Sequence, residues 1–157
     1  MNLAADVLAL AKECGVMVAT AESCTGGMVA AALTDIPGSS AVVERGFVTY
    51  TNQAKMEMLG VAAATLEDHG AVSEQVAAEM ARGALAHAPV QLAVSITGIA
   101  GPGGSEFKPE GRVCFGIAQG SGVRTETVEF GALGREHVRS AARDHALLLL
   151  KDALQRM

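Results

Sequence analysis

A serine followed by small residues is the first place in this sequence where chemistry is expected. Ser23 lies in the segment ESCTGG, residues 22–27, between an apolar run typical of a strand and one typical of a helix. A hydroxyl held at such a turn can attack a carbonyl group, because the following N–H groups and the helix dipole stabilise an oxyanion. Gly26 and Gly27 leave room for a substrate. The same pattern is also typical of a helix cap formed by Ser23 or Thr25, and caps are commoner than nucleophiles.

A serine nucleophile needs a base, and the histidines are poorly placed for that role. None of them lies in a loop that directly follows a predicted strand; they are His69, His87, His137 and His145. A Ser-His-Asp triad is therefore not expected.

Lys55 is the alternative base. It follows Asn52, which we expect to cap a helix, and the positive end of a helix dipole lowers the pKa of an ammonium group. A neutral lysine amine can accept a proton. Because most lysines are solvated surface residues, that interpretation remains open here. Ser23 and Lys55 are 32 positions apart, so only the tertiary structure can bring them together.

Cys24 is a second candidate nucleophile at the same turn, since a helix start stabilises a thiolate. No signature of a cysteine enzyme surrounds it, and a small thiol facing the core is the simpler interpretation.

A glycine-rich loop is predicted at residues 98–111. Its start, residues 98–104, matches neither a P-loop nor a dinucleotide-binding motif, because the Lys-Ser/Thr pair and the last glycine are missing. It is expected either to line or cover a pocket or to be a flexible connector.

Three arginines recur every four residues near the start of the last predicted helix. Arg135, Arg139 and Arg143 therefore share one helix face, which can hold a phosphate or carboxylate or can simply be solvated. No His, Cys, Asp or Glu spacing is typical of a metal site, and no metal is expected.

The periodicity of apolar residues predicts alternating helices and strands. Helices are expected at residues 2–14, 28–33, 53–59, 73–88 and 135–154, and strands at residues 16–21, 42–50, 91–97, 112–118 and 125–130. This order indicates an α/β fold: one domain over residues 1–157, built as a three-layer α/β/α sandwich around a mostly five-stranded mixed sheet.

In such sheets ligands bind where strands end and loops begin. The loops after three of the strands therefore supply the binding candidates Glu22, Thr25, Gly26, Gly27, Thr49, Thr97 and Gly98.

Composition excludes several functions. Half of the 157 residues are apolar, 3% are aromatic and the net charge is −5, so nucleic-acid binding is not expected. No apolar run reaches the length of a membrane span, and acidic residues interrupt the N-terminal segment where a signal peptide would be apolar. The cysteines are odd in number without CxxC spacing, which is typical of reduced thiols. We expect a cytoplasmic protein that contacts no membrane, and a homodimer.

Three motifs together resemble the CinA C-terminal-domain family. They are TAESCTGG at residues 20–27, GFVTYTNQAK at residues 46–55 and SITGIAGP at residues 95–102, and the similarity extends from about residue 4 to 150. Enzymatic members of this family are nicotinamide-nucleotide amidohydrolases. The resemblance implies a small-molecule substrate, nicotinamide mononucleotide, which is hydrolysed to nicotinate mononucleotide and ammonia without a metal or organic cofactor.

The resemblance also implies roles for single residues. Ser23 and Lys55 match the family's serine and lysine dyad. Tyr50 either orients Lys55, faces the pyridinium ring, or is only an aromatic at a strand end. Arg135 or Arg139 matches an arginine that faces the substrate.

Two positions depart from the family pattern: Gln53 stands where glutamate is usual, and Gly103 where aspartate is common. Neither belongs to the dyad. The alternative function is a nucleotide-binding or regulatory module of the same family that does not turn over its ligand.

Overall fold

The computed structural model describes residues 2–120 and 122–157. Its centre is a five-stranded sheet in the order β2-β1-β3-β4-β5. β1 (Val18–Glu22) pairs in parallel with β2 (Val43–Val48) and with β3 (Leu92–Gly98). β4 (Arg112–Gln119) is antiparallel to β3 and to β5 (Gly122–Glu129). The mixed sheet expected from the sequence is confirmed.

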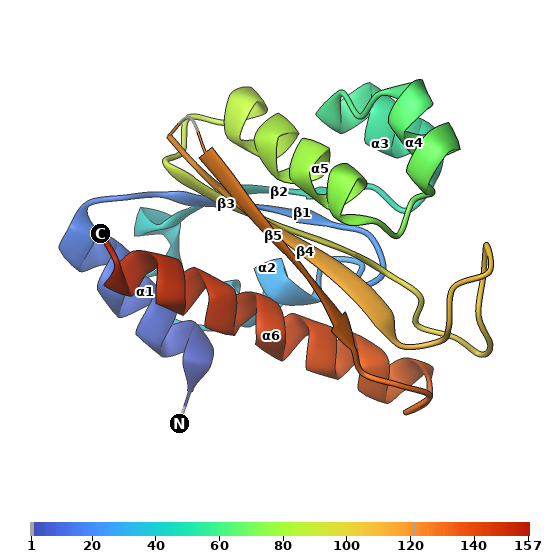
Figure 1. The fold of residues 1–157 in the computed structure, drawn as a ribbon. Helices are drawn as coiled ribbons and strands as arrows, with labels where there is room; N and C mark the ends of the chain where they lie inside the picture. Colours follow the sequence, from blue (N-terminus) through green and yellow to red (C-terminus); the bar gives the residue numbers. More distant parts are fainter. Residues whose placement is uncertain (1, 121) are drawn as a thin grey trace.

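Helices cover both faces of this sheet (Figure 1). α1 (Leu3–Cys14), α2 (Met28–Thr34) and α6 (Arg135–Gln155) lie on one face. α3 (Asn52–Leu59), α4 (Ala63–His69) and α5 (Glu74–His87) lie on the other. A separate apolar cluster fills the space beneath each helical layer. The three-layer α/β/α architecture is therefore confirmed.

Local signals explain most helix boundaries. Asn2 accepts a hydrogen bond from the Ala5 N–H at 3.1 Å and caps α1, which ends at Gly15 in the left-handed region, φ 68°. Ser73 caps α5 as predicted, by accepting from the Val76 N–H at 3.2 Å.

The cap of α3 is Thr51 and not the predicted Asn52. The Thr51 hydroxyl accepts from the Ala54 N–H at 3.0 Å, and its backbone is extended, whereas Asn52 is already the first helical residue. Either residue type is a good cap, so the spacing alone could not choose between them.

α4 was not predicted, and its start has no capping side chain of its own. A residue from α5 takes that role. The carboxylate of Glu79 accepts from the Ala62 N–H at 2.8 Å and from the Thr65 hydroxyl at 2.6 Å. A long-range contact thus completes a helix for which the local sequence has only a weak signal.

Close packing sets the position of α3 against α5. A Cβ atom added at Gly83 of α5 would lie 2.0 Å from the carbonyl oxygen of Leu59, the last residue of α3. Only glycine allows this approach. Because α3 also carries Lys55, this contact helps to place the lysine.

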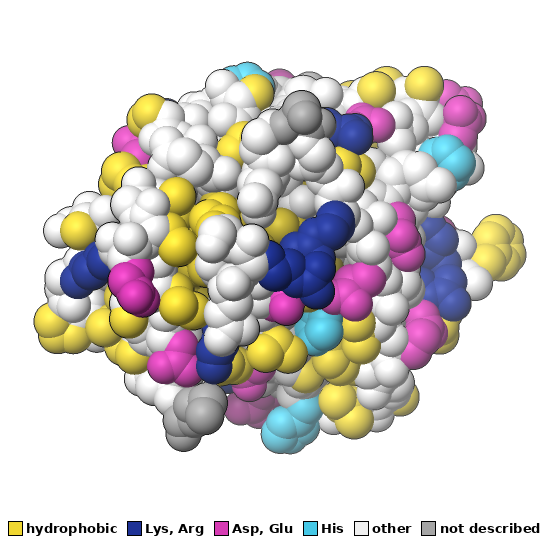
Figure 2. Space-filling view, turned by 60° about the vertical axis from the view of Figure 1, so that its left-hand side comes forward, with side chains coloured by type: hydrophobic (Ala, Val, Ile, Leu, Met, Phe, Trp, Pro, Cys, Tyr) yellow, Lys and Arg dark blue, Asp and Glu magenta, His cyan; other side chains and the backbone are white. Residues whose placement is uncertain are grey.

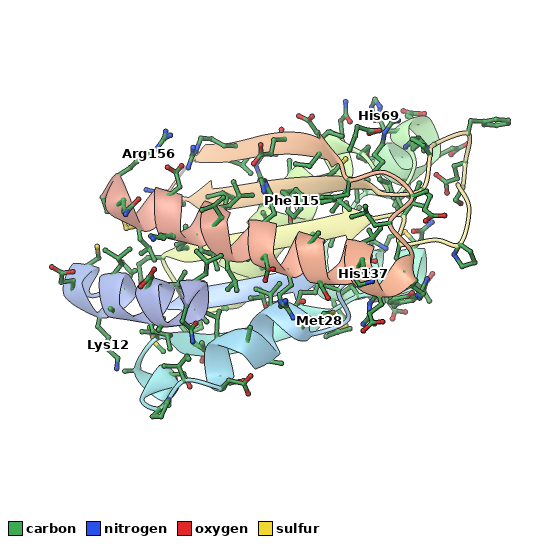
Figure 3. The ribbon with its side chains drawn as sticks, turned by 90° about the horizontal axis from the view of Figure 1, so that it is seen from below. Lys12, Met28, His69, Phe115, His137 and Arg156 are labelled. Atoms are coloured by element: carbon green, nitrogen blue, oxygen red, sulfur yellow. The ribbon has the colours of Figure 1, made fainter. Side chains whose placement is uncertain are left out.

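Three aromatic rings, those of Phe115, Phe130 and His145, pack against one another in the opposite layer. Phe115 is fully buried, and Figure 3 shows it between α6 and the sheet. Its ring centroid lies 4.6 Å from that of His145 and 6.4 Å from that of Phe130. The remaining core is aliphatic, as the composition indicates.

Charges of both signs are mixed over the face shown in Figure 2, where Lys and Arg side chains lie close to Asp and Glu side chains. Such a mixture does not build a continuous basic surface on this face. Within the part of the chain that the structure describes, no helix combines the length and the apolar character needed to cross a membrane.

Candidate active site

A cavity of about 300 Å³ opens where β1, β2 and β3 end. Ser23 and Cys24 line it from the turn after β1, Tyr50 and Lys55 from the chain after β2, and Thr97 and Gly98 from the end of β3. Residues 99–106 and Lys108 form one wall, and Arg135 reaches it from the start of α6. The carboxyl ends of the parallel strands thus meet at one site, as the fold predicts.

Glu22 shapes the turn that carries Ser23. Its fully buried carboxylate accepts hydrogen bonds from the Thr25 hydroxyl at 2.6 Å and from the N–H groups of Val29 and Ala30 at 2.9 and 3.0 Å. Glu22 therefore satisfies the start of α2, whose N-cap, Gly27, has no capping side chain. The helix-cap interpretation of Ser23 and Thr25 is wrong.

The side chain of Ser23 takes no part in capping α2. Its backbone is fixed at both ends, since its N–H donates to the Ile96 oxygen at 2.9 Å and its carbonyl accepts from the Gly26 N–H at 3.0 Å. The side chain borders the cavity, with 8% of the residue exposed. Among the residues that the structure describes, none hydrogen-bonds to the Ser23 hydroxyl, so this group is available to a ligand.

Lys55 is not the solvated lysine that its residue type favours. It is only 2% exposed and is among the largest fully enclosed side chains described. Its Nζ donates to the carbonyl oxygen of Tyr50 across 3.5 Å, a weak bond. Burial lowers the pKa of Lys55, and the opposing effects of Cys24 and Glu106 are smaller. The side chain is thus biased toward the neutral amine that a general base requires.

Ser23 and Lys55 line the same cavity, but no hydrogen bond between them is present in the described part of the chain. The long contact between Lys55 and Tyr50 is easily exchanged for another. Catalytic hydrogen bonds are often long or misaligned before substrate binds.

Cys24 is a poor nucleophile in this environment. It is 4% exposed, and burial raises the pKa of its thiol to about 12. The thiol therefore stays protonated at neutral pH, which agrees with the structural interpretation of this residue.

The three arginines of α6 have different surroundings despite sharing a helix face. Arg135 donates to the Tyr50 hydroxyl and, at 2.7 Å, to the Gly101 carbonyl, both in the cavity wall. Arg139 donates to the backbone oxygens of Cys24 and Thr25. Arg143 pairs with Asp144 at 2.9 Å. Figure 3 labels His137, which lies between Arg135 and Arg139 in the first turns of α6.

Hydrogen bonds attach the glycine-rich loop, residues 98–111, to the body of the domain. Lys108 donates to the carbonyl oxygens of His69 and Val72, each at 2.6 Å. Ser105 and Lys108 close the tip of the loop through backbone bonds of 2.8 and 2.9 Å. In Figure 1 the loop projects beyond the sheet between β3 and β4. It lines the cavity, the first of the roles considered for it.

Half of the predicted site residues reach this cavity. Those that line it are Ser23, Tyr50, Lys55, Thr97, Gly98 and Arg135. Those that do not line it are Glu22, Thr25, Gly26, Gly27, Thr49 and Arg139. Glu22, Thr25 and Arg139 instead support the Ser23 turn from behind, and the Thr49 N–H donates to the Glu22 carbonyl at 2.9 Å.

The sequence did not indicate the side of the cavity formed by Ala71 and Val72. Ala71 and Val72 precede α5 and reach the site because the Thr97 hydroxyl donates to the Ala71 carbonyl at 2.8 Å and Lys108 binds next to it. These contacts join residues far apart in sequence, and no local pattern indicates them. Across the described residues, no group of His, Cys, Asp and Glu is placed to hold a metal ion.

Comparison with known proteins places this arrangement in a family. The sequence model described as "CinA C-terminal domain" matches residues 1–154. The chain belongs to the CinA C-terminal domain family. This family member is 53% identical over 151 residues to the nicotinamide-nucleotide amidohydrolase PncC of Escherichia coli, with 96% of this chain and 92% of that protein covered. It is 59% identical over 124 residues to a CinA-like protein of Chlorobium phaeobacteroides. That match covers 76% of this chain but only 30% of the longer relative.

Solved structures of CinA relatives show the same fold. The competence/damage inducible protein CihA of Agrobacterium tumefaciens superposes with a TM-score of 0.93 at 50% identity, covering 98% of this chain and 93% of that one. The competence damage-inducible protein A of Klebsiella pneumoniae superposes with a TM-score of 0.94 at 38% identity, covering 98% and 95%.

Proposed function

We propose that this CinA-family chain hydrolyses the carboxamide of nicotinamide mononucleotide to nicotinate mononucleotide and ammonia. The observation that carries the proposal is the pairing of groups in one cavity: a serine hydroxyl with no structural partner among the described residues and a buried lysine whose pKa is lowered. The 53% identity to an Escherichia coli protein named as a nicotinamide-nucleotide amidohydrolase supplies the substrate class.

The first half of the reaction forms an acyl-enzyme. The neutral amine of Lys55 takes the proton of the Ser23 hydroxyl while the Ser23 oxygen attacks the amide carbon. Unpaired backbone N–H groups of the turn that follows Ser23 bind the resulting oxyanion. The C–N bond then breaks, and the Lys55 ammonium gives its proton to the leaving nitrogen, which departs as ammonia.

The second half releases the product. Lys55, neutral again, takes a proton from a water molecule, and the hydroxide attacks the ester carbon. The bond to the Ser23 oxygen breaks, and Lys55 returns the proton to that oxygen. Nicotinate mononucleotide leaves, and both residues regain their starting state. No metal takes part in any step.

The part of the cavity lined by Arg135 and Tyr50 suits an anionic group. Arg135 and Tyr50 lie together there, and a guanidinium group binds a phosphate through charge-assisted hydrogen bonds. Arg135 is therefore the better candidate for the substrate-facing arginine, since it lines the cavity and Arg139 does not.

The decisive experiment measures ammonia release by the purified chain with nicotinamide, its riboside and its mononucleotide in parallel. We expect turnover with the mononucleotide above the other two, and none with Ser23→Ala. If Ser23→Ala keeps wild-type turnover, serine is not the nucleophile. If the wild type binds the mononucleotide without releasing ammonia, the non-catalytic binding module is the correct function.

A further inference from the structure

Arg139 contacts the nucleophile turn through its backbone. The Arg139 Nε donates to the carbonyl oxygen of Cys24 at 3.0 Å, and its Nη2 donates to that of Thr25 at 3.4 Å. The same Nη2 lies 3.3 Å from where a Cβ atom on Gly26 would be, so the guanidinium group is in close contact with the turn. A half-buried arginine that bonds consecutive carbonyl oxygens restrains the peptide planes to which they belong.

A contact that fixes the direction of a carbonyl group also fixes the direction of the N–H group in the same peptide plane. In a trans peptide the C=O and the following N–H point in opposite directions. Because the Cys24 carbonyl faces Arg139 on α6, the Thr25 N–H points away from α6. The next amide, that of Gly26, is already used, since it donates to the Ser23 carbonyl at 3.0 Å.

The Thr25 N–H has no acceptor among the residues that the structure describes. Thr25 is fully buried, and its hydroxyl donates to Glu22 instead. Buried N–H groups without a partner are rare and costly in folded proteins. A ligand oxygen that accepts a hydrogen bond from the Thr25 N–H during the reaction would account for this unpaired donor.

Two charged side chains, those of Glu22 and Arg139, restrain the turn through different groups. Glu22 holds the Thr25 side chain and the first amides of α2, while Arg139 holds the Cys24 and Thr25 carbonyls. Without Arg139 the Cys24–Thr25 peptide could rotate and present its carbonyl oxygen to the substrate. An oxygen in that place repels an oxyanion, whereas an N–H stabilises it.

We propose that Arg139 is a positioning residue for the oxyanion hole: it orients the Cys24–Thr25 peptide so that the Thr25 N–H faces the developing oxyanion, and it does not contact the substrate. This inference rests on the proposed amidase function. It separates the roles of the arginines, with Arg135 in the cavity and Arg139 behind the turn.

The test compares steady-state kinetics of Arg139→Ala and Arg139→Lys with the wild type, using nicotinamide mononucleotide. Arg143→Ala is the matched control, because Arg143 lies one turn later on α6 and its side chain, within the part of the chain that the structure describes, bonds only to Asp144. We expect Arg139→Ala to lower kcat by about 100-fold, the typical effect of losing one oxyanion-hole donor, with KM little changed. The kcat of Arg139→Lys should lie between those of the wild type and Arg139→Ala, since an ammonium group can reach one carbonyl but not hold both. Added methylguanidinium should restore part of the kcat of Arg139→Ala only.

Other results would overturn the inference. A raised KM with unchanged kcat would show that Arg139 binds the substrate directly. A loss of kcat that neither lysine nor methylguanidinium relieves, together with a lowered Tm, would assign Arg139 a merely structural role. Wild-type kcat in Arg139→Ala would remove any role. Failure of the amidase function itself is distinguishable, because then the wild type would release no ammonia or Ser23→Ala would remain active.

Discussion

In the proposed mechanism the chemistry depends on Lys55, because only a neutral amine can accept the Ser23 proton. Its position near the start of α3 places it in a buried environment where the charged form is disfavoured. A lysine on the surface of the same helix would be protonated at neutral pH and could not act as a base. The lowered pKa of Lys55 should therefore be visible in the pH dependence of catalysis.

We expect kcat/KM to rise with pH and to level off at a pH below the ordinary lysine pKa of 10.5. Activity rises with pH because Lys55 is an inactive ammonium group below its pKa and a free amine above it. A pH–rate profile of the wild type measures this limb. A limb at the ordinary lysine value would contradict the role of burial.

Replacing Lys55 by arginine tests the same role without removing the charge. Lys55→Arg should be as inactive as Lys55→Ala in the ammonia assay, because a guanidinium group is not deprotonated in proteins. Product binding measured by calorimetry serves as the control for an intact site. Substantial turnover by Lys55→Arg would mean that Lys55 acts only through its positive charge.

At the scale of elements, the helix start at Thr51 connects stability with the site. Thr51→Ala removes the hydroxyl that accepts from the Ala54 N–H, and losing such a cap costs about 1 kcal/mol. Urea unfolding should show this loss. Gln53→Ala is the control, since it removes only the exposed hydrogen bond between Gln53 and Glu57 and should change stability much less. Equal stability of Thr51→Ala and the wild type would contradict the cap assignment.

Lys108 attaches the loop at residues 98–111 to the segment before α5. Lys108→Met keeps the length of the side chain but removes its bonds to the His69 and Val72 carbonyls. We expect KM for the mononucleotide to rise, because a wall of the cavity becomes mobile. Exposed Lys12, far from the cavity lining, offers the control Lys12→Met. An unchanged KM for Lys108→Met would show that the loop is held by other contacts.

At the scale of the whole molecule, the contact between α3 and α5 transmits packing to the site. Gly83→Ala would improve helix propensity by about 1 kcal/mol. The added Cβ would, however, clash with the Leu59 carbonyl, and overpacking of this kind costs roughly 1–3 kcal/mol. We therefore expect a net loss of stability in urea and a lower kcat as α3 shifts. A variant that is more stable and fully active would contradict this account.

The association of whole chains stays a prediction. A homodimer was expected from the small, apolar composition, and light scattering coupled to size-exclusion chromatography measures the mass directly. A mass near 16.0 kDa, that of one chain, would contradict it. The cytoplasmic location is likewise a prediction.

Much of the fold could be predicted because helices and strands leave short-range patterns. The strand before Ser23, the helix after Ser73 and the long last helix all follow from apolar periodicity and from capping residues. The motifs around Ser23 and Lys55 also marked both residues as candidates. α4 was missed because its start depends on the distant Glu79. The cap of α3 was assigned to Asn52 and not to Thr51, because both residue types are good caps.

Tertiary packing alone decided how the site is built. It buries Lys55 and places it in the same cavity as Ser23. It also lets Glu22 cap α2, and it places Arg135 in the cavity wall while Arg139 contacts the Ser23 turn. The physical reason is that burial, pKa and hydrogen-bond partners depend on neighbours that are distant along the chain. Residue types and spacing select which groups are able to react, and the three-dimensional surroundings of each group determine which of them do.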